Sequence, residues 1–500
     1  MTQKTPYHFI GIGGIGMSAL ARIILEKRHF VTGSDLAENA NTSALSQKGA
    51  SIRIGHSASY ISPEATIVYS SDIQKSNPEF QAAVALKCKM LHRSDLLAML
   101  MQEKKALAIA GSHGKTTTTS LLTMVLEYAE QDPPFAVGGL IQGVNGRWGS
   151  GDYFVAEADE SDGTFLSYHP LGAIVTNVGL EHMNHYESEE RLHKAFEQFM
   201  GQVQDPSLLF FCGDDPHLVK CSQGRGISYG YGPNCMLRIT RFLQKGWQTV
   251  IDCEFKGKAY QEIMIPLVGE YNALNGLAVF GLCLALGMDE EVIREGLKRF
   301  PGVGRRCEKR GEYREVLLID DYGHHPTEVQ KTLFAIREAI GERRLLVIFQ
   351  PHRYTRLRDH LKKFAKCFEC VDHLFVTDIY SAGETPLPGV TVEALIEEIK
   401  KQSTIAVSPI PKESAVQEIH GQLRPHDVVV TVGAGDITHF HKDLSRYLES
   451  SPPKKYTLGL IFGGKSCEHE ISLKSARFVD SSLQRELYAA ITTRLIGKSC

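Results

Sequence analysis

The stretch KALAIAGSHGKTTTTSLLTMVLEYA, residues 105–129, decides the fold, because in it a glycine-rich loop joins an apolar strand to a helix. Successive backbone amides at such a helix N-terminus face an anion, so the pattern predicts a phosphate-binding loop. Lys115 is placed to reach the β- and γ-phosphates of ATP, and the Thr116 hydroxyl to ligate Mg²⁺. The two residues between Gly111 and Gly114 give a shorter spacing than the common Walker A pattern.

A second glycine-rich loop opens the chain. FIGIGGIGMSAL, residues 9–20, has the same strand–loop–helix order and matches GxGxxG at Gly11, Gly13 and Gly16. Asp35 ends the next apolar run, near the spacing of an acid that binds a ribose. These features alone suggest NAD. Their physical content, however, is a helix N-terminus that faces a diphosphate, and a UDP-sugar also carries a diphosphate. The residues therefore leave both ligands open.

Acidic side chains crowd the segment VAEADESDGTF, at the end of a predicted buried strand. The acids are Glu157, Asp159, Glu160 and Asp162. They repel one another unless cations lie near them. His182 follows the next predicted strand, and a carboxylate with a neutral imidazole is suited to share a Mg²⁺ that ATP brings. A solvated acidic turn is the alternative interpretation.

Two asparagines and two histidine-rich clusters complete the polar candidates. Asn272 and Asn275 lie three residues apart, so they share one face of a predicted helix, either to cap it or to contact an adenine or ribose. DDYGHHP, residues 320–326, and PHRYTR, residues 351–356, each follow a predicted strand. Open α/β sheets bind ligands at the carboxyl ends of their strands, so we expect a site in these loops.

Composition narrows the class of protein. A chain of 500 residues exceeds one hydrophobic core, so several domains are expected. The hydrophobic share of 43% and the charged share of 23% are ordinary for a globular protein. The formal net charge of −3 argues against broad nucleic-acid binding. Eleven scattered cysteines suit a reducing compartment, and no apolar run is long enough to span a membrane. We therefore expect a cytoplasmic protein without membrane insertion.

Apolar runs alternate with helical stretches along most of the chain, which predicts an α/β fold with mainly parallel sheets. The pattern starts at YHFIGIG, again at KALAIAG, and a third time at EVLLIDD, after the glycine- and proline-containing boundary FPGVGRR. SSPPKK indicates a linker. The expected domains are 1–104, 105–305 and 306–449, followed by a linker at 450–455 and a last segment at 456–500.

Together these motifs resemble the Mur ligases over residues 8 to about 440. They occur in the order GIGGIGMSALA, YSSDI, HRSDLL, GSHGKTTTT, EADESDGTF, TNVGLEHM, GEYNALN, GVGRR, DDYGHHPTE, PHRYTR, IYSAGE and GAGDI. The resemblance implies a Rossmann-like N-terminal domain for a UDP-sugar, a central P-loop ATPase domain and a Rossmann-like C-terminal domain for an amino acid. The family's ATPase loop has the shorter GxxGKT spacing, which explains the loop at Gly111.

The resemblance also implies a role for each candidate residue. The UDP-sugar would contact Gly11, Gly13, Gly14, Gly16, Asp35, Ser70, Ser71, His92 and Arg93. ATP would contact Gly111, Ser112, His113, Gly114, Lys115, Thr116, Thr117, Asn272, Asn275, Arg306 and Asp321. Two Mg²⁺ ions, replaceable by Mn²⁺, are expected, with ligands Thr116, Glu157 and His182. The amino acid would contact Tyr322, His324, His352 and Arg356. The catalytic group would comprise Lys115, Glu157, His182, His324 and Arg356.

Two positions depart from the family pattern. Glu181 stands where Asp usually precedes the metal-binding histidine, and Tyr271 stands where a histidine often precedes the asparagine. The extra methylene at Glu181 affects the geometry around the metal ligand rather than the reaction. Many members of other branches carry a carbamylated lysine near the second metal, for which Lys194 is a weak candidate.

The last segment resembles a different family. LIFGGKSCEHEISLKSA, residues 460–476, is similar to the start of the D-alanine–D-alanine ligases, and Glu468 and Ser472 would match substrate-binding positions there. The segment is too short for an independent core. We therefore expect an incomplete piece of a fused second enzyme that cannot catalyse ligation without its ATP-grasp domains.

The branch of the Mur ligases that these motifs resemble joins L-alanine to UDP-N-acetylmuramate at the expense of ATP, for peptidoglycan precursor synthesis. A murein-recycling branch, which attaches a tripeptide to the same UDP-sugar, has similar N-terminal motifs. An NAD-dependent dehydrogenase would explain the first loop and Asp35, but not the loop from Gly111 to Thr116. A nucleotide-binding module without turnover would bind ATP and ligate nothing.

Overall fold

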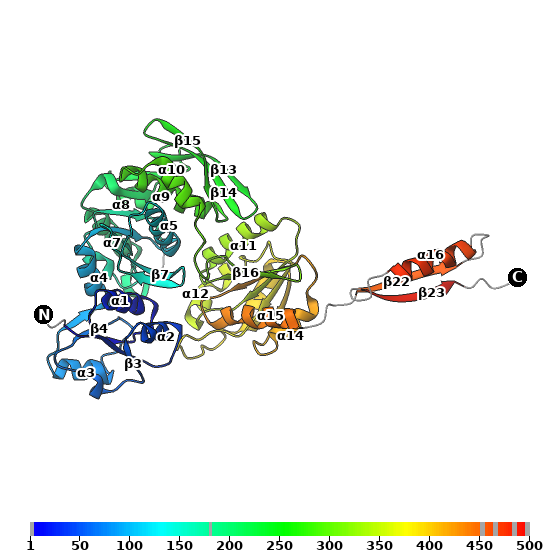
Figure 1. The fold of residues 1–500 in the computed structure, drawn as a ribbon, viewed down its shortest axis with the longest axis horizontal. Helices are drawn as coiled ribbons and strands as arrows, with labels where there is room; N and C mark the ends of the chain where they lie inside the picture. The colour runs from blue at the N-terminus through cyan, green and yellow to red at the C-terminus, as the bar shows by residue number, and fades with distance from the viewer. Residues whose placement is uncertain (1–4, 180–182, 451–455, 464–468, 483–487, 496–500) are drawn as a thin grey trace.

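The computed structural model describes residues 5–179, 183–450, 456–463, 469–482 and 488–495. These residues form three large sheets, one after another along the chain, and a small strand pair near the C-terminus. The first domain (blue), the middle domain (cyan to green) and the third domain (yellow to orange) lie against one another, and the red C-terminal unit lies apart (Figure 1). The α/β fold class expected from the sequence is confirmed.

The first sheet is a five-stranded parallel sheet in the order β3-β2-β1-β4-β5. Its strands are β1 (Tyr7–Ile10), β2 (Val31–Asp35), β3 (Ser51–Ile54), β4 (Thr66–Tyr69) and β5 (Met90–His92). Its helices are α1 (Ile15–Glu26), α2 (Ala40–Gln47), η1 (Ala58–Tyr60), α3 (Pro78–Ala85) and α4 (Arg93–Gln102). The chain changes direction across the sheet between β1 and β4, so the glycine loop after β1 lies at the switch point where such sheets bind ligands.

The middle sheet has ten strands in the order β15-β14-β13-β12-β11-β10-β6-β9-β7-β8. Its strands are β6 (Lys105–Ala110), β7 (Phe135–Ile141), β8 (Val144–Arg147), β9 (Tyr153–Glu157), β10 (Gly172–Val175), β11 (Leu209–Cys212), β12 (Ile227–Gly230), β13 (Leu237–Lys245), β14 (Gln248–Phe255) and β15 (Lys258–Ile265). Its helices are α5 (Lys115–Tyr128), η2 (Thr164–Ser167), α6 (Met183–Tyr186), α7 (Glu189–Gly201), η3 (Pro206–Leu208), α8 (Pro216–Cys221), α9 (Glu270–Ala285) and α10 (Glu290–Lys298). Seven neighbouring strands, in the sheet order β13-β12-β11-β10-β6-β9-β7, pair in parallel. At the two edges, β8 pairs antiparallel with β7, and β14 and β15 form antiparallel pairs beyond β13, which the sequence did not predict.

The third sheet has six strands in the order β16-β17-β21-β18-β19-β20, of which only the β16–β17 pair is antiparallel. Its strands are β16 (Glu308–Tyr313), β17 (Val316–Asp321), β18 (Leu345–Phe349), β19 (His373–Val376), β20 (Ala406–Pro409) and β21 (Val428–Val432). Its helices are α11 (Pro326–Ile340), α12 (Tyr354–Phe364), α13 (Val392–Gln402), α14 (Ala415–Gln422), η4 (Asp436–His439) and α15 (Phe440–Ser450).

The hydrophobic core runs without a break from the first sheet into the middle sheet. Phe9 of β1 and Leu107 of β6 belong to the same buried cluster, and the side chain of Asn145 donates 2.7 Å hydrogen bonds to Ile15 O and Ser18 Oγ of α1. The third sheet instead has its own buried clusters, one on each face. The first two domains are therefore joined through apolar packing as well as hydrogen bonds.

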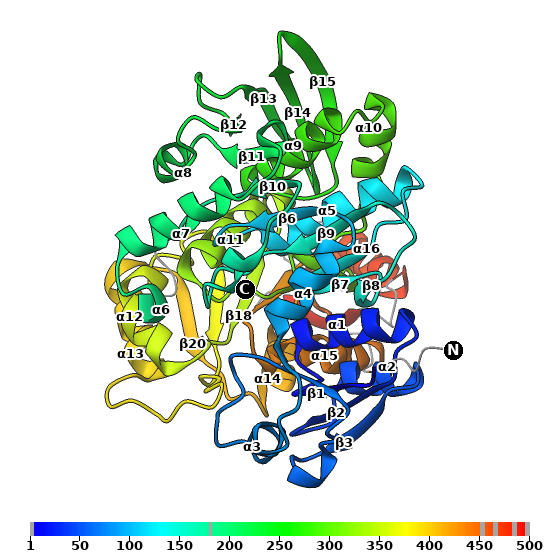
Figure 2. The same ribbon diagram turned by 90° about the vertical axis from the view of Figure 1, so that its left-hand side faces the viewer.

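The third domain meets the middle domain along α11. In the β13–β14 hairpin, Gln244 Nε2 donates a 2.9 Å hydrogen bond to Ala335 O, and the Lys309 ammonium lies 4.2 Å from the ring centre of Trp247. Viewed from the side, the third domain lies behind the first two (Figure 2). This docking brings the start of α11 to the loop that follows β6.

The C-terminal unit consists of β22 (Tyr456–Gly463), α16 (His469–Ser482) and β23 (Tyr488–Leu495). The two strands pair in parallel, as in a single βαβ unit. Ser450 ends α15, and the rest of the predicted linker lies outside the described residues, as does Glu468. None of the helices in the described ranges is long and apolar enough to cross a membrane.

Candidate functional site

The loop after β6 has the backbone of a phosphate-binding loop. Gly111 and Gly114 have φ values of 129° and 85°, which disfavour any residue with a side chain. A Cβ at Gly111 would overlap Thr176 Oγ1. That hydroxyl donates a 2.6 Å hydrogen bond to His113 O, and Asn177 Oδ1 accepts one of 3.0 Å from His113 N. The loop after β10 thus supports the phosphate loop from one side.

Lys115 begins α5 and is held by buried acceptors. Its Nζ lies 2.6 Å from Gly111 O and 2.6 Å from Glu160 Oε2. Burial acts against the charged amine, but the carboxylates of Glu160, Asp159 and Glu157 outweigh it and raise the pKa of Lys115. Burial also raises the pKa of Glu160 to about 7, despite the lysine beside it. The ammonium is therefore charged and held inside the loop that is predicted to receive phosphates.

Thr116 and Glu157 form the candidate metal site. Thr116 Oγ1 lies 3.1 Å from each carboxylate oxygen of Glu157, and Gly138 N donates a 2.8 Å hydrogen bond to Glu157 Oε2. A hydroxyl and a carboxylate are hard oxygen ligands, which fit Mg²⁺. His182 and Glu181 lie outside the described residues. Among the residues that the structure describes, no group of three or more His, Cys, Asp or Glu side chains forms a metal site.

The acidic segment after β9 connects the middle domain to the first domain. Arg93 Nη2 lies 3.2 Å from Asp159 Oδ2 and 3.6 Å from Asp162 Oδ2. Ser71 Oγ donates a 2.6 Å hydrogen bond to Asp162 Oδ2 and lies 3.1 Å from His92 Nε2. The cations that the crowded acids were expected to need are thus Arg93 and Lys115, one from each domain.

Hydrogen bonds to the neighbouring strand β2 hold the first glycine loop in place. Gly11 N and Ile12 N donate to Ser34 O at 2.9 and 3.0 Å, and Ser34 Oγ donates a 2.7 Å hydrogen bond to the buried Glu79. Glu79 also lies 2.8 Å from His8 Nε2. Burial acts to raise its pKa, but hydrogen bonds from His8, Ser34 and His56 outweigh it and lower the pKa of Glu79.

Asp35 also fixes this loop, because its Oδ2 accepts a 2.7 Å hydrogen bond from Gly13 N. A Cβ at Gly13 would overlap Asn39 Nδ2 and lie 2.9 Å from Asp35 Oδ2. A Cβ at Gly16 would lie 3.3 Å from Arg93 Nη1. Gly14 caps α1 without a side-chain hydrogen bond, so no cap side chain occupies the first amides of the helix. Ser70 is buried next to Ser71, beyond β4.

The asparagines of α9 face the phosphate loop. A Cβ at Gly114 would lie 2.9 Å from Asn275 Oδ1, and Asn275 Nδ2 donates a 3.2 Å hydrogen bond to Asn272 Oδ1. Tyr271 is half-buried, and a Cβ at Gly269 would lie 2.6 Å from its ring. Asn272 and Asn275 thus lie on one face of α9, as their spacing predicted, with Asn275 next to the loop.

Asp321 ends β17 and holds the turn that carries the third-domain residues. It is buried, and it accepts 2.8 Å hydrogen bonds from Cys307 N and Gly323 N. Burial raises the pKa of Asp321 to about 6. Arg306 lies on the other side of the same turn, with its guanidinium carbon 5.2 Å from the ring centre of Tyr322.

The predicted amino-acid residues lie together. The ring centres of Tyr322 and His324 are 5.3 Å apart, and those of His324 and His352 are 5.7 Å apart. Arg356 Nη1 lies 2.8 Å from His352 Nδ1, and the His352 ring stacks on Tyr380. Burial lowers the pKa of His324 to about 4 and that of His352 to about 3, so both rings are neutral at neutral pH.

Sequence reasoning missed the roles of three residues that contact candidate site residues. Glu160 was seen only as one of several acids, although it pairs with Lys115. Glu328 was quoted within DDYGHHPTE and given no role, yet its Oε1 lies 3.1 Å from His113 Nδ1. Tyr380 lies in the IYSAGE motif, whose position in the order of motifs was its only signal.

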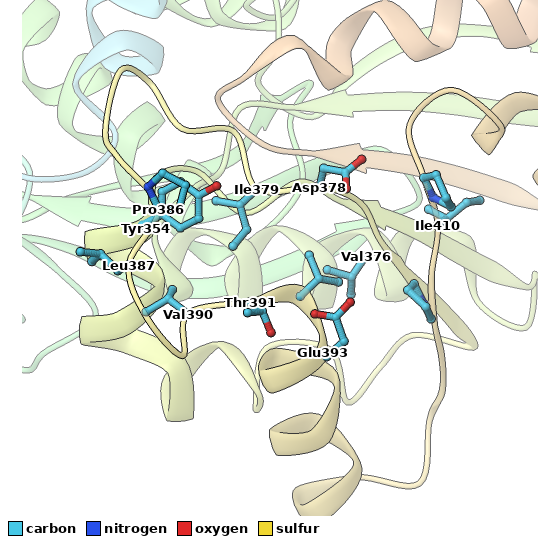
Figure 3. A pocket seen from close by; sticks show the side chains of 13 residues that line it. Tyr354, Val376, Asp378, Ile379, Pro386, Leu387, Val390, Thr391, Glu393 and Ile410 are labelled. Carbon is cyan, nitrogen blue, oxygen red and sulfur yellow. The ribbon is translucent and has the colours of Figure 1, made fainter.

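Two further features lie away from this cluster. Lys194 forms an exposed ion pair of 2.8 Å with Glu190 on α7. A cavity of about 430 Å³ lies where β19 and β20 end, between the loop at 378–391 and the start of α13 (Figure 3). Its lining includes Tyr354, Asp378 and Glu393 but none of the predicted site residues.

The fold and the loop after β6 define a class: a three-domain α/β protein of the phosphate-loop type, with candidate site residues from all three domains. Three family models match the chain in order. They are the Mur ligase family catalytic domain at residues 6–105, the Mur ligase middle domain at 109–283 and the Mur ligase glutamate ligase domain at 305–435. The chain belongs to the Mur ligase family.

Similar proteins agree with this assignment. A UDP-N-acetylmuramate–L-alanine ligase of Protochlamydia amoebophila is 48% identical over 89% of this chain and 98% of its own length. A bifunctional MurC/Ddl enzyme of Chlamydia caviae is 44% identical over 98% of this chain, but the chain spans only 60% of that relative. The crystal structure of a UDP-N-acetylmuramate–alanine ligase from Thermotoga maritima superposes with a TM-score of 0.78, at 28% identity, over 89% of this chain and all of that one.

Proposed function

We propose that this protein joins L-alanine to UDP-N-acetylmuramate and converts ATP to ADP and phosphate in the same reaction. The observation that carries the proposal is the convergence of residues from three domains on the loop that bears Lys115. Arg93 reaches the acidic segment that holds Lys115, and Glu328 reaches the same loop from the third domain. The sequence relatives that bear this activity in their names support the choice of substrates.

The first step would activate a carboxylate. An oxygen of the muramate carboxylate attacks the γ-phosphorus of ATP, the bond to the bridging oxygen breaks, and ADP leaves behind an acyl phosphate. Both reacting groups are anionic, so positioning and charge neutralisation dominate the barrier. Lys115 would supply a positive charge at the β- and γ-phosphates. A Mg²⁺ bound by Thr116, Glu157 and His182 would supply further charge neutralisation.

The second step would form the amide. The amine of L-alanine attacks the acyl carbon, the carbon–oxygen bond to phosphate breaks, and the amine loses a proton. His324 and His352 are neutral, because burial lowers both pKa values, and a neutral imidazole can accept that proton. Arg356 beside His352 is suited to hold the alanine carboxylate by a bidentate contact.

The C-terminal unit would correspond to the beginning of the second enzyme in the bifunctional relatives. Ser472 lies on α16, but the described part of this unit comprises two strands and one helix. We therefore propose no D-alanine–D-alanine ligase activity for this segment by itself.

The proposal is tested by phosphate release from ATP and Mg²⁺ in the presence of UDP-N-acetylmuramate, with L-alanine and a murein tripeptide as separate acceptors. We expect release only when both the sugar nucleotide and L-alanine are present, with a product of matching mass. Release with the tripeptide alone would assign the protein to murein recycling. Lys115→Met should lower the rate of release about a hundredfold or more, whereas Lys105→Met, at an exposed lysine at the start of β6, should not.

A further inference from the structure

Glu328 lies where two candidate subsites meet. It stands in the first turn of α11. Its Oε1 lies 3.1 Å from His113 Nδ1 in the phosphate loop and 3.9 Å from Arg306 Nη1. Its Oε2 accepts a 3.2 Å hydrogen bond from His324 N and lies 3.8 Å from His324 Nδ1. One carboxylate thus contacts residues assigned to the ATP site and to the amino-acid site.

We propose that Glu328 is a positioning residue that links ATP binding in the middle domain to the alanine pocket in the third domain. The two carboxylate oxygens divide the work, because Oε1 faces the phosphate loop and Oε2 faces the His324 backbone. A movement of His113 on nucleotide binding would therefore be transmitted to His324 through a single rigid group. The inference rests on the proposed function for the identity of the two ligands.

The charge and the surroundings of Glu328 fit this role. Its side chain is 17% exposed, and burial acts to raise its pKa. The hydrogen bond from His113 and the neighbouring His324, His113 and Arg306 groups outweigh burial, so the pKa of Glu328 is lowered and the carboxylate is charged. A hydrogen bond to a charged group in a half-buried site is stronger than one between neutral groups. The hydrogen bond between His113 and Glu328 is therefore charge-assisted.

A purely structural role is the competing explanation, because Glu328 also accepts a 3.4 Å hydrogen bond from His325 N at the start of α11. Loss of such an anchor would lower the amount of folded enzyme and hence kcat, without a change in either KM. It would also act independently of His113. The two explanations therefore differ in which kinetic constant changes. They also differ in whether the effects of substituting Glu328 and His113 multiply when both residues are replaced.

The experiment is a double-mutant cycle on the full chain with Glu328→Ala, His113→Ala and the pair. We expect each single substitution to raise the KM for ATP and for L-alanine about tenfold, and the pair to raise them by no more than the larger single effect, since contacting residues are not additive. The KM for UDP-N-acetylmuramate should stay within about twofold, because the contacts of Glu328 lie in the other two domains. Glu338→Ala, an exposed acid on the same helix, is the matched control.

A conservative variant guards against misfolding. Glu328→Gln keeps an acceptor for His324 N but loses the charge, so it should melt like the wild type and still raise the alanine KM. Wild-type KM values in Glu328→Gln, or single effects that multiply in the pair, would overturn the inference. If the wild type ligates neither amine, the proposed function fails. The same cycle measured by calorimetric binding of a non-hydrolysable ATP analogue then decides whether Glu328 supports the phosphate loop.

Discussion

Lys115→Met removes the ammonium while it keeps most of the side-chain volume, so it separates the charge from the packing. The proposed reaction needs that charge where negative charge develops on the transferred phosphoryl group. Removal of one such preorganised group typically lowers kcat by about a hundredfold to a thousandfold. We expect a loss of that size in ligation, measured as phosphate release under saturating substrates.

The same substitution has a cost in stability that can be worked out from Glu160. The carboxylate is 1% exposed and loses its 2.6 Å partner, so in the variant it folds in the neutral form. Keeping a group with an ordinary pKa of 4.5 protonated costs about 1.4 kcal/mol per pH unit above that value. A neutral carboxyl thus costs about 4 kcal/mol near pH 7.5 and about 1.4 kcal/mol near pH 5.5, whereas the wild-type carboxyl, with a pKa of about 7, already costs about 3 and about 1.4 kcal/mol at these pH values.

The direction in which this penalty changes with pH follows from the raised pKa of Glu160. The folded-state pKa of Glu160 is raised above its unfolded value, so the penalty is absent at low pH and grows as the pH rises. Urea unfolding, followed by circular dichroism at both pH values, should show the variant regaining about 1 kcal/mol more than Lys105→Met on acidification, because Glu160 in that control, with a pKa of about 7, also takes up a proton. Adding Glu160→Gln should restore stability but not activity. An equal stability loss at both pH values, or no rescue by the glutamine, would refute the reasoning.

Three further predictions concern other parts of the site. Glu79→Ala removes a buried carboxylate that pairs with His8 and Ser34, so it should cost about 3–5 kcal/mol in urea unfolding; a loss below about 1 kcal/mol would contradict a buried network. His324 has a folded-state pKa lowered to about 4, so stability should be full above about pH 6.5 and fall by about 3 kcal/mol as the pH drops to 4. His324→Asn should remove that part of the slope, and an unchanged slope would show that the ring does not titrate there. Gly13→Ala should weaken binding of UDP-N-acetylmuramate at least about tenfold in calorimetry, because a methyl group there overlaps Asn39; wild-type affinity would place the sugar nucleotide elsewhere.

Much of the fold follows from local sequence. Each glycine loop sits between an apolar run and a helix, and the positive φ values of Gly11, Gly111 and Gly114 are conformations that glycine adopts readily. The alternation of strands and helices predicted parallel sheets, and the boundary at FPGVGRR precedes β16. The antiparallel strands β14 and β15 were not predicted, because strand pairing depends on which edge of the sheet is free.

Single short motifs also indicated where the site would lie. The spacing of Asn272 and Asn275 placed both on one face of α9, and the histidine clusters followed β17 and β18. His182 stays a prediction, since it lies outside the described residues. Lys194 is exposed on α7, and its modification stays untested.

By itself the sequence determined the local geometry, because backbone conformation, helix starts and strand ends depend on neighbouring residues. It supplied the phosphate loop, the first glycine loop and the residue types of the site. Only the tertiary structure decided which residues far apart in the chain contact one another. Arg93 meets Asp159 across 66 positions in the chain, and His113 meets Glu328 across 215. Such pairs form only when separate domains dock, and docking depends on the shape and charge of whole surfaces that no short motif encodes.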